Sequence, residues 1–236
     1  MNDITIIHYT ANKVEKQFAK NIRDHLLSWL PKSVPIISVS HEPIDFGQNI
    51  YVFGFEYSIY NIYRQILIGT QQVKTKYVMA HEDDALYNLE HFSHRPPDDT
   101  FAYNINRWNV NEDIFFHRNR ANMSMCIAPT KLMVDTLEKR FEKFPRIMSR
   151  EEMGAVGGFG EPGKFEVKYG LPEVKIERFS TKIPTLVFNH RPSVGGVRKI
   201  TEKDTVVKDL PYWGNAKELW ERMWGNEIIN SNRDKK

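Results

Sequence analysis

The chain is almost free of cysteine. Its 236 residues include a single cysteine, Cys126, so no disulfide can form within the chain. A sequence with one thiol is typical of a reducing compartment. Because Cys126 lies inside the apolar run 123–128, we predict a buried thiol and not a reactive nucleophile.

Long hydrophobic runs are also missing. No apolar stretch approaches the roughly 20 residues that a membrane-spanning helix needs. The apolar run at residues 4–7 is too short for the core of a signal peptide. These absences lead us to expect a cytoplasmic protein without a transmembrane segment.

Neither sign of charge dominates. The chain has 33 Lys and Arg against 30 Asp and Glu, a net charge of +3, which is far from the strongly basic character of a dedicated nucleic-acid binder. Phosphate-bearing partners remain compatible with this mild excess. Hydrophobic residues at 41% and charged residues at 27% describe an ordinary globular protein with enough length for a substantial core. Oligomeric state is not readable from these numbers.

The first third of the chain alternates strands and helices. Apolar runs predict strands at 4–9, 35–39 and 77–80, and a strand or extended loop at 49–53. Helical periodicity predicts a helix after residue 12 that ends before Pro31, and a second helix over 58–72. Asn12 with Glu15 resembles a capping box at the start of the first helix. This order predicts an α/β fold in which helices flank a mixed, mostly parallel sheet.

The remaining two thirds are less regular. We predict strands at 100–105, 122–128 and 185–189, with a charged loop between the first two. A helix is expected from Pro129 to about Pro145, and another after Asn215, capped with the help of Glu218 and ending at Gly225. Residues 154–163 contain five glycines and one proline, which is typical of a mobile loop. We expect one domain over 1–225 and a polar tail over 226–236.

Three consecutive carboxylates, Glu82, Asp83 and Asp84, directly follow the predicted strand 77–80. Crowded carboxylates are stable when a cation or hydrogen-bond donors lie among them, and oxygen ligands of this kind suit Mg²⁺ or Mn²⁺. The alternative is that Asp84 caps a helical turn over 85–91. In a parallel sheet the loop 10–12 would lie at the same edge as the carboxylates, which favours a ligand site there.

Three features together resemble the GT-A glycosyltransferases. They are the N-terminal strand–helix–strand half, the acidic triplet 82–84 in the position of the family's DxD motif, and a C-terminal strand that leads to His190. One departure is that many bacterial members have Asp-x-Asp-Asp where this chain has His81 followed by the triplet. The resemblance implies a metal-dependent hexosyl- or pentosyltransferase with a GT-A-like fold, a nucleotide-sugar donor, most often a UDP-sugar, and Mn²⁺ or Mg²⁺. It assigns residues 1–92 to nucleotide binding and 93–225 to acceptor binding.

The resemblance also implies roles for individual residues. The metal would be held by Asp83, Asp84 and His190. A nitrogen ligand is accepted more readily by Mn²⁺ than by Mg²⁺. The residues expected to contact the donor are Thr10, Ala11, Asn12, Arg64, Glu82, Asp83, Arg191, Arg198 and Lys199. Two of these, Arg191 and Arg198, flank Gly195 and Gly196, whose amides could add donors for the diphosphate.

An inverting transfer needs a carboxylate base to take the proton of the acceptor hydroxyl. The candidates are Glu151 and Glu152, before the glycine-rich segment, and Glu161 within it. A retaining enzyme needs no such base, and the sequence leaves both outcomes open. An acceptor ring could stack on aromatic residues in the predicted loop between the two middle strands, and at least two of these residues are expected to pack in the core. They are Trp108, Phe115, Phe116 and His117.

Other functions fit the same residues. A nucleotidyltransferase or phosphoesterase could use the acidic triplet for Mg²⁺, although such enzymes usually have a glycine-rich phosphate loop and residues 4–14 contain no glycine. A non-catalytic binding protein of the same fold is a third possibility. The acceptor could be a surface glycan, a lipid-linked sugar, a protein, or a hydroxymethylated base of phage DNA. For DNA, the basic segments 118–120 and 191–199 would contact phosphates.

Overall fold

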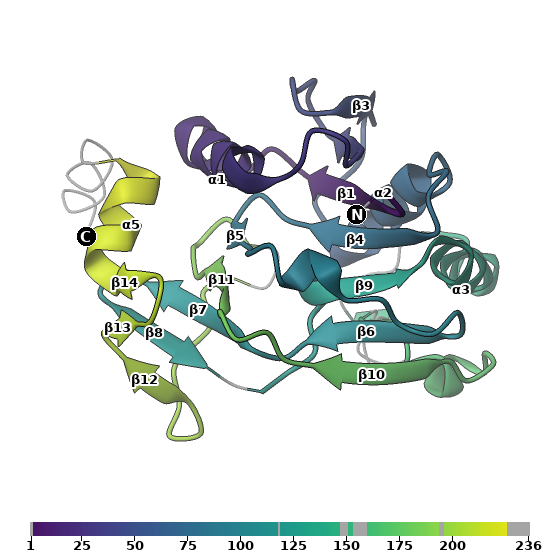
Figure 1. The fold of residues 1–236 in the computed structure, drawn as a ribbon. Helices are drawn as coiled ribbons and strands as arrows, with labels where there is room; N and C mark the ends of the chain where they lie inside the picture. Colours follow the sequence, from purple (N-terminus) through teal and green to yellow (C-terminus); the bar gives the residue numbers. More distant parts are fainter. Residues whose placement is uncertain (1, 118, 147–150, 153–159, 194–195, 226–236) are drawn as a thin grey trace.

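Two sheets organise the chain (Figure 1). The computed structural model describes residues 2–117, 119–146, 151–152, 160–193 and 196–225. In spatial order, the larger sheet contains β10 (Lys175–Phe179), β6 (Thr100–Asn104), β9 (Cys126–Pro129), β4 (Tyr77–His81), β1 (Ile4–Thr10), β2 (Ile36–Ser40) and β3 (Gln48–Tyr51). Neighbouring strands are parallel except at β9, which is antiparallel to both β4 and β6.

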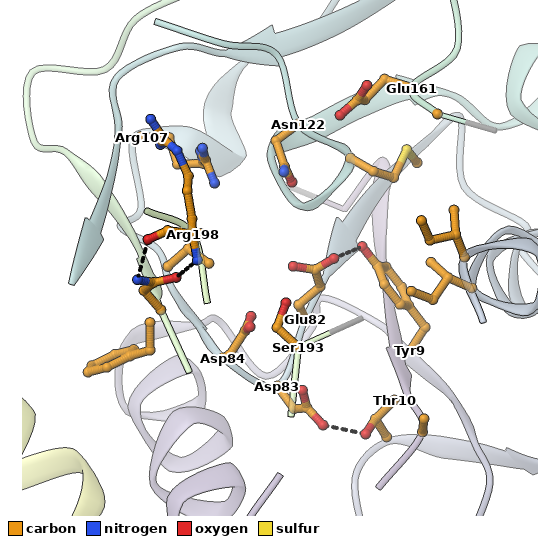
Figure 2. Close-up of a pocket in the computed structure, with 18 of the residues that line it drawn as sticks. Tyr9, Thr10, Glu82, Asp83, Asp84, Arg107, Asn122, Glu161, Ser193 and Arg198 are labelled. Carbon is orange, nitrogen blue, oxygen red and sulfur yellow. Dashed lines mark hydrogen bonds between the residues drawn. The ribbon is translucent and has the colours of Figure 1, made fainter. Parts of the chain in front are cut away.

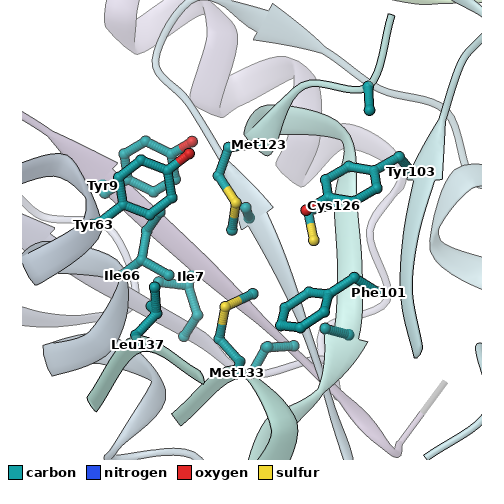
Figure 3. Close-up of a cluster of buried hydrophobic side chains, with 14 of the residues drawn as sticks. Ile7, Tyr9, Tyr63, Ile66, Phe101, Tyr103, Met123, Cys126, Met133 and Leu137 are labelled. Atoms are coloured by element: carbon teal, nitrogen blue, oxygen red, sulfur yellow. The ribbon is translucent and has the colours of Figure 1, made fainter. Parts of the chain in front are cut away.

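Helices cover both faces of this larger sheet. They are α1 (Lys16–Trp29) on one face, and α2 (Ile59–Thr70) and α3 (Thr130–Lys143) on the other. The central strand β1 is buried on both faces, so its apolar side chains divide between the two layers. Ile4 and Ile6 join the cluster that includes Leu26 of α1, whereas Ile7 packs with Ile66 of α2 (Figure 3). The predicted α/β fold with a mostly parallel sheet flanked by helices is confirmed.

A smaller sheet continues from the end of β4. Its strands, in spatial order, are β12 (Thr205–Val207), β8 (Ile114–His117), β7 (Arg107–Asn111), β11 (Thr185–Phe188) and β5 (Ala85–Leu86). A short hairpin, β13 (Asp209–Leu210) with β14 (Gly214–Asn215), precedes α5 (Ala216–Trp224). The side chain of Asn215 accepts hydrogen bonds from the backbone of Lys217 and Glu218, which confirms the predicted cap of α5. Trp224 of α5 stacks on Phe18 of α1 with ring centroids 3.9 Å apart, which joins this layer to the first sheet.

The predicted start of α1 is wrong. The helix begins at Lys16, and its N-cap is Glu15, whose carboxylate accepts from the backbone N–H of Phe18. Asn12 lies before the helix with a left-handed backbone (φ 54°), and its side-chain oxygen accepts from the backbone N–H of Glu42 at 2.9 Å. Because the Asn12 side chain is used to hold the loop after β2, it is not available to cap α1.

The predicted charged loop between the two middle strands is a pair of strands. β7 and β8 pair antiparallel, and the turn between them includes Glu112 with a left-handed backbone (φ 43°). Phe115 and Phe116 are fully buried, and Trp108 stacks on His117 with centroids 5.0 Å apart. None of these four aromatic side chains lines the cavity described below. They pack within the smaller sheet because cross-strand aromatic pairs stabilise such a hairpin.

Other predictions depend on segments that are only partly described. Residues 153–159 of the glycine-rich segment and the predicted tail 226–236 lie outside the described residues. The described part, 160–163, is held in place: the Tyr103 hydroxyl donates to the carbonyl of Pro162 at 2.7 Å. Cys126 is fully buried, as predicted. Within the parts of the chain that are described, no helix combines the length and apolar character needed to cross a membrane.

Buried His91 predicts how stability depends on pH. Its ring is fully buried and accepts from Asn104 Nδ2 at 3.1 Å. Burial, with smaller contributions from His94 and His81, lowers the pKa of His91 to about 3. The unfolded ring titrates near pH 6.5, so the unfolded state binds protons first as the pH falls. This one group is therefore expected to cost about 2 kcal/mol of unfolding free energy between about pH 7 and pH 5.

The substitution His91→Gln tests this expectation. Glutamine keeps an oxygen that can accept from Asn104 but has no titrating group in this range. Urea unfolding at about pH 7 and pH 5 should show a smaller pH-dependent loss of stability in the variant than in the wild type. Equal losses in the two proteins would show that His91 does not remain neutral in the folded state.

Candidate functional site

An open cavity of about 700 Å³ lies where the carboxyl ends of β1 and β4 meet the smaller sheet (Figure 2). Its volume is in the range of cavities that bind small molecules and cofactors. Loops at the carboxyl ends of parallel strands are the usual position of ligand sites in α/β folds. The charged and titratable residues that line the cavity include Glu82, Asp83, Asp84, Arg107, Arg120, Glu161, Lys164, His190 and Arg198.

The three carboxylates after β4 have different partners. Glu82 Oε1 accepts a hydrogen bond from the Tyr9 hydroxyl at 2.7 Å, and Asp83 Oδ2 accepts from the Thr10 hydroxyl. Both donors come from β1, which is the parallel neighbour of β4. Asp84 is followed by strand β5 and not by a helix. The alternative that Asp84 caps a helical turn over 85–91 is therefore wrong.

Strand β11 brings His190 to Asp84. The backbone carbonyl of Asp84 accepts from Phe188 N–H at 2.8 Å, which fixes the two segments side by side. His190 Nε2 then lies 2.9 Å from Asp84 Oδ2. Burial alone lowers the pKa of His190, but the hydrogen bond and charge of Asp84 outweigh it and the net pKa is raised. Two of the three residues expected to bind a metal are thus brought into direct contact.

The crowding of the carboxylates changes how they hold protons. Burial, followed by the charge of Asp84, raises the pKa of Glu82 to about 8 despite the hydrogen bond from Tyr9. Burial and the charge of Asp84 also raise the pKa of Asp83 to about 6, opposed by Thr10. Carboxylates with raised pKa values gather where a site is built to receive positive charge.

A divalent cation fits the Asp84–His190 end of this cluster. Asp84 Oδ1 is buried and has no hydrogen-bond partner among the described residues, so one carboxylate oxygen is free to bind a cation. A separation of 2.9 Å between Asp84 Oδ2 and His190 Nε2 also suits two neighbouring ligands of one metal ion. No group of three or more His, Cys, Asp or Glu side chains in the described ranges is arranged to hold a metal. Protein groups would therefore supply only part of a coordination shell.

The other wall of the cavity is basic. Arg198 is a predicted donor-binding residue. Its backbone N–H donates to Asn189 Oδ1 at 2.7 Å, and its carbonyl accepts from Asn189 Nδ2 at 3.1 Å. These bonds hold Arg198 beside Asn189, the residue before His190. Its guanidinium forms an ion pair with Asp204 and lies over the ring of Phe116. Arg107 lies beside it (Figure 2). The sequence prediction missed Arg107, the first residue of β7, because the segment 107–111 was predicted as part of a loop.

The remaining predicted donor residues divide into two groups. Thr10 and Ala11 line the cavity. Asn12, Arg64, Arg191 and Lys199 do not: Arg64 stacks on the ring of Phe55 at 4.4 Å, and Arg191 and Lys199 are exposed. Gly195 and Arg118 lie outside the described residues. Contact of these residues with a ligand remains a prediction.

The candidate bases also differ in position. Glu151 is exposed, Glu152 pairs with Arg146, and neither lines the cavity. Glu161 does line it and pairs with Lys164 at 3.0 Å. Figure 2 shows Glu161 on the opposite side of the cavity from Asp83. Of the three glutamates, Glu161 is the one among the described residues that line the cavity, and a role as the base remains a prediction for all three.

Comparisons with known proteins find similarity at low sequence identity. No protein-family model and no curated protein sequence matches the chain. The bifunctional IspDF from Campylobacter jejuni has a TM-score of 0.41 and 14% identity over 76% of this chain and 50% of that one. S. aureus TarS 1–349 in complex with UDP-GlcNAc has a TM-score of 0.44 and 11% identity over 79% and 58%.

A third solved structure is a glycosyltransferase involved in the glycosylation of the major capsid of PBCV-1. It has a TM-score of 0.42 and 10% identity over 78% of this chain and 92% of that one. Coverage of the other proteins is partial: the chain spans half of IspDF and 36% of another S. aureus TarS structure.

Proposed function

We propose that the cavity binds a nucleoside-diphosphate sugar with a divalent cation and transfers the sugar to an acceptor hydroxyl. The observation that carries the proposal is the Asp84–His190 pair. It has a buried carboxylate oxygen without a partner in the described part of the chain, and it faces a wall that contains Arg198. A cation and a diphosphate would complete each other's charge and coordination at this place.

The donor would lie along the carboxyl ends of β1 and β4. Thr10 and Ala11 offer a position for the ribose and base, and Glu82 and Asp83 offer carboxylate oxygens to hydroxyl groups. The apolar side chains of Val14, Ile59 and Ile62 line the same cavity and would cover an aromatic ring. We propose a UDP-sugar as the donor, with Mn²⁺ preferred over Mg²⁺ because one ligand is an imidazole nitrogen.

The chain's own groups would then divide the work of the transfer. A bound Mn²⁺ or Mg²⁺ supplies positive charge to the departing diphosphate. Arg198 adds a fixed guanidinium on the same side. For an inverting transfer, Glu161 takes the acceptor's proton while the acceptor oxygen bonds to the anomeric carbon and the bond from that carbon to the diphosphate breaks. The diphosphate leaves with the electron pair of the broken bond.

Release of nucleoside diphosphate tests this function and identifies the donor. The protein is incubated with Mn²⁺ and, in separate reactions, with UDP-, GDP- and TDP-linked sugars. Many transferases hydrolyse their donor slowly when no acceptor is present, so we expect release above background from one class of donor. Removal of the cation with EDTA should stop it. If the wild type releases no more nucleoside diphosphate than an Asp84→Asn variant from any of the donors, the transferase proposal is contradicted.

A further inference from the structure

Arg107 is a buried cation that has no ion-pair partner among the residues that the structure describes. It is only 6% exposed, and its Nε atom has no hydrogen-bond partner among the described residues. None of the ion pairs formed within the described ranges includes this side chain. Burying an arginine without a hydrogen-bonded counter-ion is unfavourable. A chain that keeps such a residue in the wall of an open cavity provides a site for an anion from outside.

The charges around Arg107 also favour an anion site at this side chain. Burial lowers the pKa of Arg107, the neighbouring charge of Arg198 lowers it further, and the carboxylates of Glu82, Asp84 and Glu161 oppose the shift from a distance. Figure 2 shows the two arginine side chains ending close together. Arg198 has a protein counter-ion in Asp204, whereas no ion pair among the described residues includes Arg107.

A neutral donor, the side-chain amide of Asn122, lines the same cavity. Asn122 uses its amide oxygen to accept from Ser124 N–H at 2.9 Å, and no hydrogen bond of its NH₂ group to a described residue is formed. Arg120, a second cation, also lines the cavity and is exposed to solvent. Arginine with an amide NH₂ is a donor set that matches the oxygens of a phosphate or carboxylate.

We propose that Arg107 binds a phosphate or carboxylate group carried by the acceptor. The identification of the ligand as the acceptor rests on the proposed function. The negative charge of the donor's diphosphate would be balanced by the cation at the Asp84–His190 pair and by Arg198. Arg107 belongs to β7 and lines the same cavity as Glu161, whose carboxylate lies near enough to raise the pKa of Arg107. An acceptor fixed by its anionic group at Arg107 would place a neighbouring hydroxyl within the range of the Glu161 carboxylate.

Titration with two small probes tests the proposal. Glycerol 1-phosphate carries the anionic group and glycerol does not, and each is titrated into protein with UDP and Mn²⁺ present in excess. Wild type is expected to bind glycerol 1-phosphate and not glycerol. Arg107→Gln should weaken this binding about tenfold or more, with the affinity for UDP and Mn²⁺ within about twofold of wild type. Arg107→Lys keeps the positive charge and should retain part of the binding, which separates a binding role from a folding role.

The control and the opposing results are distinct. Arg178→Gln removes one positive charge from the exposed surface of β10, away from the cavity, and should leave both affinities unchanged. Loss of UDP affinity in Arg107→Gln with glycerol 1-phosphate binding intact would assign the anion to the donor and overturn the proposal. So would an absence of glycerol 1-phosphate binding to wild type. If UDP fails to bind while glycerol 1-phosphate binds through Arg107, the nucleotide-sugar function falls and the anion site stands.

Discussion

Asp84→Asn is expected to weaken the Mn²⁺-dependent binding of UDP about 100-fold, which corresponds to about 2.7 kcal/mol. Asp84 is the member of the acidic triplet in contact with His190, and it has the buried oxygen without a described partner. Asparagine keeps the shape and can still accept from His190 Nε2, but it lacks the negative charge that a cation needs. Isothermal titration of UDP into each protein, with Mn²⁺ and with EDTA, measures the effect.

The stability of this variant should not fall. The charge of Asp84 raises the pKa values of Glu82 and Asp83, so its removal relieves that repulsion, and asparagine keeps an acceptor for His190 Nε2. The free energy of unfolding is therefore expected to stay the same or rise. Asp24→Asn is the matched control, since Asp24 is exposed on α1 and forms an ordinary surface pair with Lys20. Equal UDP affinity in Asp84→Asn and Asp24→Asn, with Mn²⁺ present, would show that Asp84 holds no cation.

Arg140→Met is expected to lower the free energy of unfolding by about 3–5 kcal/mol. Arg140 and Glu166 form a buried ion pair, with the two residues 0% and 2% exposed, and Arg140 Nε lies 2.6 Å from Glu166 Oε1. Arg140 Nη1 also donates to the carbonyl of Gly160 at 2.6 Å, and Glu166 Oε2 accepts from Gly163 N–H at 2.5 Å. Removing the arginine leaves a buried carboxylate and a buried carbonyl without their donor.

A double-mutant cycle separates the pair from the packing around it. Arg140→Met with Glu166→Leu removes both charges, so we expect it to be more stable than Arg140→Met alone. Lys217→Met is the control, because its pair with Glu221 at 3.9 Å is on the surface and should be worth less than about 1 kcal/mol. Urea unfolding of the wild type, Arg140→Met, Glu166→Leu and the double variant measures the coupling. A loss below about 1 kcal/mol in Arg140→Met would show that the pair does not hold this region.

The Arg140–Glu166 pair also positions the segment 160–166, which contributes Glu161 to the cavity. Residues 160–166 are tied to α3 through Arg140, and Glu161 lies within this tied segment. Because Glu161 is the proposed base, looseness here is expected to reduce the rate of transfer more than the affinity for the donor. Arg140 acts in this respect as a positioning residue, through the segment and not through contact with substrate.

Local patterns in the sequence were enough to predict much of the first sheet. The apolar run of β1 and the helical spacing of Phe18, Ile22 and Leu26 in α1 depend on neighbouring residues along the chain. Parallel strands end at one edge, and this rule correctly predicted that Thr10 and Asp83 would lie together. The buried thiol of Cys126 followed from its apolar neighbours in the same way.

Long-range pairing was beyond the sequence. β9 enters the larger sheet antiparallel between β4 and β6, and no local pattern specifies which strands a short apolar run will join. The hairpin β7–β8 was predicted as a loop because its turn contains Glu112 and Asp113 and no glycine or asparagine pair. Since Arg107 lies at the start of that unrecognised strand, its position in the cavity wall was missed with it.

The charge state of the site was also inaccessible from sequence. That three carboxylates follow β4 is evident, but which of them meets His190 depends on β5 turning back to pair with β11. Residues 84 and 190 are far apart in the chain, and only the register of the smaller sheet brings them together. The alternative of a helical turn after Asp84 would have separated them, whereas the resemblance had placed both at one metal site.

Thermal unfolding of the wild-type protein with a panel of nucleoside diphosphates, each with and without Mn²⁺, tests the central claim most directly. Ligands that bind the folded state stabilise it by mass action, by about 2.7 kcal/mol at a concentration of 100 times Kd. We predict that one nucleotide raises the Tm by several degrees, that the rise requires Mn²⁺, and that it disappears in Asp84→Asn. No rise with any nucleotide, or a rise that neither Mn²⁺ nor Asp84 affects, would contradict the claim that this cavity binds a metal–nucleotide complex.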